Sequence, residues 1–176
     1  MAATAVATTV ELLGPRQRIL ITGGAGFIGG AVVRHLLQHS QAQVFNLDKL
    51  GYASDGTSIE LVLKALGPAA EGRYQLLRTD LADGEATAAA VQQVDPDLVL
   101  HLAAESHVDR SIAGPEAFIS SNVTGTFQLL QAVRAHWEGL PQERRDSFRF
   151  HHISTDEVFG SLGSTARFSE ATAFDP

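Results

Sequence analysis

The chain has 176 residues, 44% of them hydrophobic, and a formal net charge of −7. This composition suits one well-buried globular domain, while the acidic balance argues against a nucleic-acid partner, whose phosphates need a basic face. The chain has no cysteine, which excludes a disulfide framework and a thiolate metal site.

The first 17 residues are rich in Ala and Thr and have neither the early positive charge nor the continuous apolar core of a signal peptide. We therefore expect a flexible tail over residues 1–17 and one domain over residues 18–176. Because no apolar run is long enough to cross a bilayer, we also expect a cytoplasmic protein with no membrane partner.

Short apolar runs alternate with longer amphipathic runs along the domain. Strands are expected at residues 18–22, 43–47, 74–78, 97–102 and 148–154. A first helix is indicated by Ile28, Val32, Val33, Leu36 and Leu37. The longest helix, over residues 115–137, has an apolar stripe of Val123, Phe127, Leu130 and Trp137. This alternation predicts a doubly wound parallel α/β sheet, whose ligands bind beyond the carboxyl ends of the strands.

The stretch "ILITGGAGFIGG" joins the first expected strand to the first helix. Two glycine patterns fit it, one starting at Gly23 and one at Gly24, and both continue through Gly26 and Gly29. An early glycine makes the turn, Gly26 lets a pyrophosphate approach the backbone, and Gly29 lets helix and strand pack closely. The alternative is an ordinary strand-to-helix turn, but the strand before and the helix after favour dinucleotide binding.

An acidic residue follows the second strand, as the dinucleotide interpretation requires. Asp48 lies 19 residues beyond Gly29, where a carboxylate would bind the adenosine ribose hydroxyls and favour NAD over NADP. The adjacent Lys49 weakens that preference, since an ammonium could meet a 2′-phosphate. Asp80, after the third strand, is equally well explained as a helix cap or turn residue.

Other chemistries find little support. The seven His residues do not show the spacing of a helical metal motif, and His151 and His152 would face opposite sides of a strand, so we expect no metal site. Ser106 is not in a G-x-S-x-G elbow, which argues against a serine hydrolase.

The stretch "HHISTDEVFG" places Thr155, Asp156 and Glu157 after the fifth strand. Ser154 and Glu157 fit a helix capping box, and the stretch alone favours that interpretation. The position favours another, because the end of this strand faces the substrate crevice. There, two carboxyl groups could divide acid and base roles in an elimination.

Five stretches together resemble a known family: "ITGGAGFIG", "NLDKLGYAS", "HLAAESHVDRSI", "SNVTGTFQLLQAVR" and "FRFHHISTDEVFGSLG". They are similar to the dTDP-glucose 4,6-dehydratases, extended short-chain dehydrogenase/reductases. The similarity is continuous from about Arg18 to the last residue. The resemblance implies a Rossmann-type NAD-binding domain that belongs to an NAD-dependent hydro-lyase of nucleotide-sugar metabolism, such as dTDP-rhamnose biosynthesis.

The resemblance also implies roles for individual residues. The NAD pyrophosphate region would be held by Gly23, Gly26, Phe27, Ile28 and Gly29, the ribose by Asp48, Lys49, Leu50 and Gly51, and the adenine by Asp80 and Leu81. The nicotinamide side would be lined by Leu102, Ala103, Ala104, Glu105, Ser106 and Ser121. Ser106 and Thr155 would touch the sugar of dTDP-glucose. Glu157 would remove the C5 proton while Asp156 protonates the leaving C6 hydroxyl.

One part of the family pattern is missing. The family uses a Tyr-x-x-x-Lys pair after strand five, whereas this chain has two tyrosines, Tyr52 and Tyr74, neither followed by Lys four residues on. We therefore expect an N-terminal half, truncated after strand five and without the nucleotide-sugar domain, that is inactive alone. Strand five would then form an unprotected apolar sheet edge.

Two alternatives remain. The chain could belong to another nucleotide-sugar dehydratase or an epimerase, although the paired carboxylates argue against an epimerase. It could instead be a non-catalytic dinucleotide-binding module. In the full-length form the family usually dimerises through helices of this half, including residues 115–137, so the resemblance implies a homodimer.

Overall fold

The computed structural model describes residues 17–163 and 167–176. The expected flexible tail, apart from its last residue, lies outside the described residues. No helix in the described part of the chain is long and apolar enough to cross a membrane.

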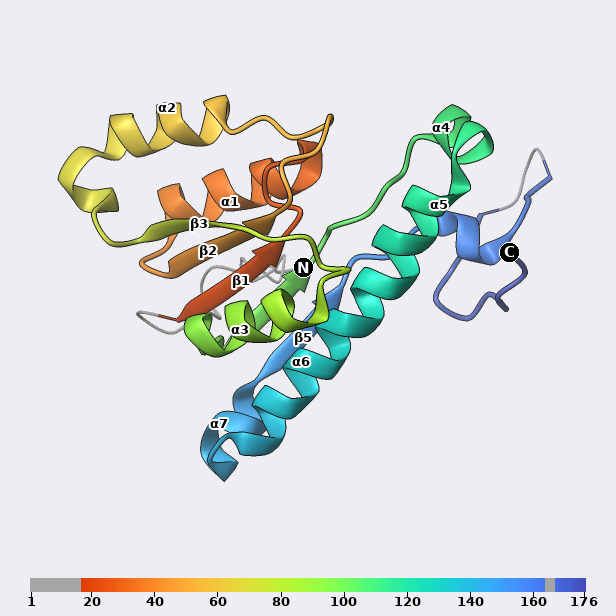
Figure 1. The fold of residues 1–176 in the computed structure, drawn as a ribbon. Helices are drawn as coiled ribbons and strands as arrows, with labels where there is room; N and C mark the ends of the chain where they lie inside the picture. The colour runs from red at the N-terminus through yellow and green to blue at the C-terminus, as the bar shows by residue number, and fades with distance from the viewer. Residues whose placement is uncertain (1–16, 164–166) are drawn as a thin grey trace, which may run out of the picture.

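A five-stranded sheet, all parallel, forms the centre of the molecule (Figure 1). Its strands are β1 (Arg18–Thr22), β2 (Gln43–Asp48), β3 (Tyr74–Arg78), β4 (Leu98–His101) and β5 (Arg149–His152). The order β3-β2-β1-β4-β5 confirms the doubly wound prediction, and the expected strands differ from the observed ones by at most two residues at either end. Between β3 and β4 the chain crosses back past β1, which creates a switch point beside β1 and β4.

Helices cover both faces of the sheet (Figure 1). They are α1 (Phe27–His39), α2 (Thr57–Leu66), α3 (Gly84–Val94), α4 (Val108–Ala113), α5 (Pro115–Phe118), α6 (Thr126–Gly139) and α7 (Gln142–Ser147). Two short 3₁₀ segments, η2 (Gly67–Ala70) and η4 (Asp156–Phe159), and a π-helix, η3 (Ile119–Gly125), complete the set.

The two hydrophobic clusters show how β1 divides its side chains between the layers. Ile19 and Ile21 pack with α1 and α2, whereas Leu20 packs with α3 and α6. Because successive side chains of a strand point to opposite faces, a continuously apolar strand is what a sheet covered on both faces requires.

The longest expected helix differs from the prediction in two ways. It is interrupted by the π-turns of η3, and its predicted apolar stripe faces outward: Val123, Phe127 and Leu130 are 58%, 55% and 45% exposed. The side chains that pack on the core are instead Leu129 and Val133. Leu129 directly precedes Leu130, so it lies about 100° around the helix from the predicted stripe, on the face that meets the core.

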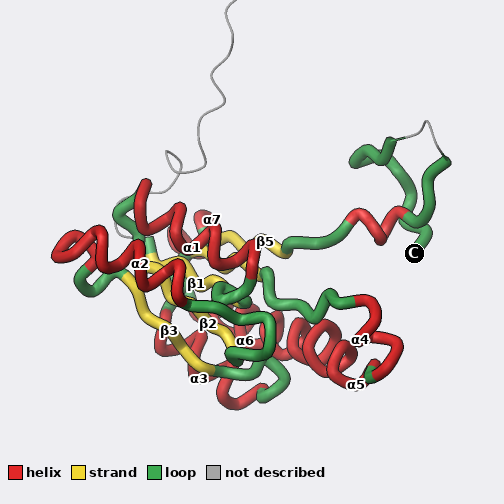
Figure 2. The backbone as a smooth tube through the Cα atoms, turned by 90° about the horizontal axis from the view of Figure 1, so that it is seen from above, coloured by secondary structure: helices red, strands yellow, loops and turns green. Residues whose placement is uncertain are grey.

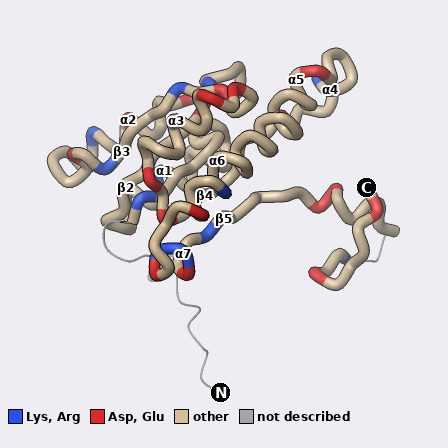
Figure 3. The backbone as a smooth tube through the Cα atoms, turned by 60° about the horizontal axis from the view of Figure 1, so that its bottom comes forward, with Lys and Arg blue, Asp and Glu red and all other residues tan. Residues whose placement is uncertain are grey.

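The strand β5 forms one edge of the sheet, as expected, and pairs with β4. The expectation that this edge is apolar was wrong, because Arg149, His151 and His152 are exposed and only Phe150 packs against the core. After β5 the chain projects away from the sheet (Figures 2 and 3). There it folds on itself, with the Phe159 ring against Phe168 and Phe174.

Candidate functional site

The glycine turn after β1 lies at the switch point and resolves the two glycine patterns. Gly23 has a φ of +70°, a conformation that L side chains rarely adopt, and its N–H donates to the Leu47 carbonyl at 2.9 Å. Gly23 is therefore the turn glycine. Gly24 is needed for a different reason, since a Cβ there would lie 2.3 Å from Oδ1 of the buried Asn46.

The other two glycines lie at the start of α1. A Cβ at Gly29 would lie 2.1 Å from the Gly23 carbonyl oxygen, so α1 can pack this close only without a side chain. Gly26 is the N-cap of α1, and no side chain caps the helix. Phe27 and Ile28, in the first turn, are 95% and 61% exposed, so Ile28 does not join the core as its spacing suggested. The positive end of the α1 dipole is thus open toward a ligand.

Asp48 is 7% exposed and binds the glycine turn. Its Oδ2 accepts the Ala25 N–H at 2.9 Å, and its Oδ1 accepts the Leu50 N–H and the Ser54 hydroxyl at 2.8 and 2.9 Å. Three donors fix the orientation of this buried carboxylate. Ser54, one of those donors, was not predicted from the sequence.

The Lys49 side chain turns toward the segment that follows β4. Its Nζ lies 2.7 Å from the Ser121 hydroxyl and 3.3 Å from Oε1 of Glu105. The ammonium therefore already has two partners, which reduces its availability for a 2′-phosphate. Leu50 and Gly51, which follow, are both exposed in the loop after β2.

The loop after β4, residues 102–106, is fixed from two sides. The Leu102 and Ala103 N–H groups donate to the carbonyl and the hydroxyl of Thr22 at the end of β1. On the other side, Asn122 accepts the Glu105 N–H and donates to the Glu105 carbonyl, both at 2.8 Å. Ala104 and Ser106 stay exposed.

Asn122 was missed by the sequence reasoning. It lies in the π-helix η3, a rare geometry that is frequent at functional sites. The available signal was the polar run "SSN" inside an otherwise amphipathic helix, because such residues interrupt helices through side-chain bonds.

His101 is buried beneath this loop, at the end of β4. Its two ring nitrogens lie 2.6 Å from the Thr22 hydroxyl and 2.9 Å from the Thr126 hydroxyl. Burial, with a smaller effect from the neighbouring His152, lowers the pKa of His101 from 6.5 to about 4. The imidazole is consequently neutral near pH 7 and links β1, β4 and α6.

This shift predicts a loss of stability in acid. Because the unfolded chain takes up the proton near pH 6.5 and the folded chain only near pH 4, stability falls as the pH drops through that window. We expect about 2 kcal/mol less unfolding free energy at pH 5 than at pH 7, at about 1.4 kcal/mol per pKa unit. Urea titrations at both pH values test this, with His101→Asn as the control. If the pH dependence is the same in that variant, His101 is not the group responsible.

The residues expected at the adenine end differ in exposure. Asp80 is exposed and accepts the Ala82 N–H at 3.0 Å, as the alternative turn interpretation predicted. The helix cap is Asp83, which accepts the Ala86 N–H. The Leu81 side chain is 6% exposed and belongs to the core, so Leu81 can meet a ligand only through its backbone.

The stretch after β5 contains both carboxylates in exposed positions. The cap of η4 is Thr155, whose Oγ1 accepts the Glu157 N–H at 3.3 Å, whereas the capping box was expected to start at Ser154. Asp156 and Glu157 both lie in η4, beyond the end of the strand. Because the segment after β5 projects from the sheet, the structure does not bring Thr155–Glu157 together with the glycine turn among the described residues (Figure 2).

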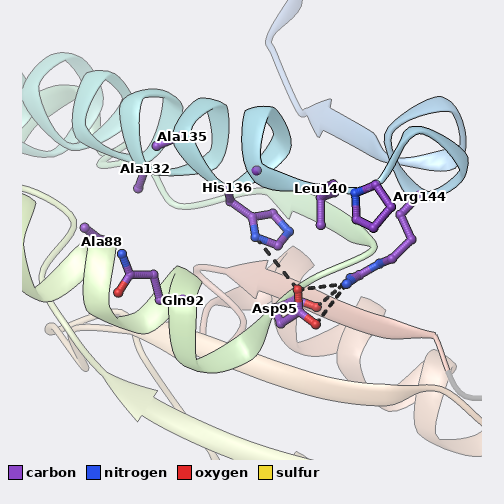
Figure 4. Close-up of a pocket in the computed structure, with 10 residues that line it drawn as sticks. Ala88, Gln92, Asp95, Ala132, Ala135, His136, Leu140 and Arg144 are labelled. Carbon is purple, nitrogen blue, oxygen red and sulfur yellow. Dashed lines mark hydrogen bonds and ion pairs between the residues drawn. The ribbon is translucent and has the colours of Figure 1, made fainter.

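A pocket of about 400 Å³ lies elsewhere, between α3 and α6 (Figure 4). Arg144 lies there at 3.0 Å from both Asp95 carboxylate oxygens and 2.9 Å from Asp97, and these bonds raise its pKa. The charged groups of this pocket are thus paired with one another. The helix α7 carries both acidic and basic residues (Figure 3). Asp95 and Asp97 precede β4, so this pocket is at the amino ends of the strands, away from where such sheets bind ligands.

The sheet order, the glycine turn and the buried acid after β2 define a Rossmann-type domain. The chain belongs to the family of GDP-mannose 4,6 dehydratase, whose model matches residues 20–176.

The similarity to individual proteins is more specific than the match to the family. The chain is 48% identical over 163 residues to a dTDP-glucose 4,6-dehydratase of Neisseria gonorrhoeae, covering 92% of this chain and 45% of that protein. A dTDP-glucose 4,6-dehydratase of Streptomyces venezuelae, solved with NAD and TYD bound, superposes with a TM-score of 0.72 at 36% identity, covering 90% of this chain and 45% of the other. A UDP-glucose 4-epimerase of Thermus thermophilus, solved with NAD, superposes with a TM-score of 0.71 at 28% identity, covering 90% of this chain and 44% of the other. The chain thus spans about half the length of the relatives it matches.

Proposed function

We propose that the chain is the cofactor-binding part of an NAD-dependent dTDP-glucose 4,6-dehydratase, which forms a 4-keto-6-deoxy sugar nucleotide. The observation that carries the proposal is the Asp48 carboxylate, buried against the Ala25 N–H of the glycine turn at the switch point. The 48% identity to a dehydratase favours this reaction over that of the structurally similar epimerases. A cytoplasmic location and a role in deoxysugar synthesis are further expectations of the same proposal.

The residues fit the cofactor on structural grounds. The glycines let the turn pack closely against the start of α1, and the end of α1 that no side chain caps favours a pyrophosphate. Asp48 would accept the ribose hydroxyls, with Lys49, Leu50 and Gly51 beside it. The fixed loop 102–106 and Ser121 would bound the nicotinamide side, and Asp80 and Leu81 the adenine.

NAD, when bound, supplies a hydride acceptor that later returns the hydride. The chain's own contribution to the chemistry would be the elimination between these two transfers. Glu157 would take the C5 proton and Asp156 would give a proton to the leaving C6 hydroxyl, while Ser106 and Thr155 bind the sugar. Because Thr155–Glu157 lie apart from the cofactor residues in this structure, the projecting segment would have to close over the sheet.

The tyrosine and lysine that this chemistry also needs would come from outside the 176 residues. We propose that residues 18–176 form the NAD-binding domain and that the chain alone does not turn over. The test mixes the chain with the separately produced C-terminal half of a related dehydratase, NAD⁺ and dTDP-glucose, and follows the 4-keto product by its absorbance in alkali. If the halves associate and NAD⁺ binds without product, a non-catalytic binding module becomes the better account.

We further propose a homodimer through the exposed apolar stripe of η3 and α6. Phe127, Leu130 and Trp137 are 55%, 45% and 39% exposed on one helix, an apolar surface that suits a second copy of the same stripe. Phe127→Glu is expected to raise the dimer dissociation constant about 100-fold or more, because it buries a charge at the centre of the contact. Sedimentation equilibrium measures this. The control, Ala135→Glu, adds the same charge on another face of α6. If both variants weaken the dimer equally, the stripe is not the dimer interface.

A further inference from the structure

The loop between β2 and α2, residues 49–56, is tied to the glycine turn at both ends. At its start, Asp48 accepts the Leu50 N–H and the Ser54 hydroxyl. At its end, the Asp55 N–H donates to the Ala25 carbonyl at 2.8 Å. The loop is therefore attached to the turn through Asp48 and Ala25.

The loop also contacts the segment that follows β4. Lys49 bonds to Ser121 and pairs with Glu105. Three residues further, the Tyr52 ring is stacked under the Arg110 guanidinium of α4, with 3.7 Å between the guanidinium carbon and the ring centroid. The loop after β2 and the segment after β4 are thus joined twice, once through the cationic side chain of Lys49 and once through that of Arg110.

The topology places these contacts over the carboxyl end of β1. In the sheet, β2 and β4 flank β1, so a contact between the segments that follow β2 and β4 must pass over the carboxyl end of β1. That end carries the glycine turn. Figure 1 shows the loop after β2 on the side of the sheet where the chain runs from β4 to α4.

The stack also gives a role to Arg110. This residue belongs to the "SHVDRSI" stretch that marks the resemblance, yet it has no part in the proposed chemistry. Its guanidinium is engaged with Tyr52, a residue likewise outside the proposed cofactor and substrate contacts.

We infer that the Tyr52–Arg110 stack and the Lys49–Glu105 pair form a strap over the proposed dinucleotide site, and that the opening of this strap limits both entry and exit of the cofactor. This inference rests on the proposed dinucleotide site. With both contacts formed, the strap lies across the carboxyl end of β1, so it must open for the cofactor to enter as well as to leave. Weakening it raises the association and dissociation rates together and leaves the dissociation constant almost unchanged.

The test follows NADH fluorescence in stopped flow with the whole chain. For Tyr52→Leu, which removes the aromatic face, we expect both rate constants to rise about threefold, the effect of losing one exposed cation–π contact. Tyr52→Phe keeps the ring and is expected to match the wild type. Arg110→Gln removes the same stack from the other side, so the double variant is expected to be no faster than either single variant. Circular dichroism verifies that each variant is folded.

The outcomes are distinguishable. Rates unchanged in both Tyr52→Leu and Arg110→Gln overturn the strap and leave the proposed function in place. A faster dissociation without faster association also overturns it, because the contact would then form only around bound cofactor. Wild-type chain that binds no NADH overturns the proposed function and the strap with it.

Discussion

Gly29→Ala is expected to abolish NAD binding and to destabilise the fold. The new Cβ would lie 2.1 Å from the Gly23 carbonyl oxygen and 2.9 Å from the Gly24 Cα, both backbone atoms that cannot rotate away. The start of α1 would have to move off the turn, at a cost of about 1–3 kcal/mol or more for overpacking. The displaced turn would lose its fit to a pyrophosphate, so we expect NAD⁺ affinity to fall about 100-fold or more, as when several contacts are lost together.

Two other glycines provide matched controls. A Cβ at Gly30 would meet the flexible end of Arg34 at 3.4 Å, so Gly30→Ala is expected to keep both stability and binding. A Cβ at Gly26 would lie 3.3 Å from the Gly23 carbonyl oxygen, its one close contact, so Gly26→Ala is expected to fold but to bind NAD⁺ weakly. Urea titration and calorimetry separate the two effects. Wild-type affinity in Gly29→Ala would exclude the glycine turn as the pyrophosphate site.

Asp156→Asn and Glu157→Gln are each expected to lower product formation by the reconstituted dehydratase by about 10²- to 10⁴-fold, the usual contribution of a general acid or base. NAD⁺ binding is expected to stay unchanged, because the segment after β5 lies apart from the glycine turn. Glu157→Gln is further expected to stop the exchange of the C5 proton with deuterium from the solvent.

The control for these variants is Glu170→Gln, which removes an exposed carboxylate from the same projecting segment. It is expected to leave the rate near that of the wild type. A similar rate loss in all three variants would mean that the segment tolerates no charge change. Full activity in Asp156→Asn and Glu157→Gln would mean that Thr155–Glu157 have a purely structural role, as a capped 3₁₀ turn.

The parts of the fold that depend on local patterns were predictable from the sequence. The strands follow from short apolar runs, and the glycine turn followed by Asp48 reports a backbone constraint that few other sequences satisfy. Hydrophobicity alone did not show which apolar stripe of residues 115–137 faces the sheet. That choice depends on how closely Leu129 and Val133 approach α3, a tertiary property.

The contacts between distant segments were not predictable either. Asn122 bonds to Glu105 across 17 residues, and Arg110 meets Tyr52 through a stack that no spacing rule describes. The sequence likewise did not indicate that the long side chain of Lys49 reaches Glu105 and Ser121. Polar side chains with several rotatable bonds choose partners from the assembled fold, so a single sequence indicates their chemistry but not their direction.

The most direct test of the account is calorimetric titration of the chain with NAD⁺ and with NADP⁺. The account predicts one dinucleotide site per chain and at least about tenfold tighter binding of NAD⁺, because the Asp48 side chain leaves no favourable place for a 2′-phosphate while Lys49 is held by Glu105. Binding that is absent, or that favours NADP⁺, would contradict the central claim that the carboxyl end of this sheet is an NAD site.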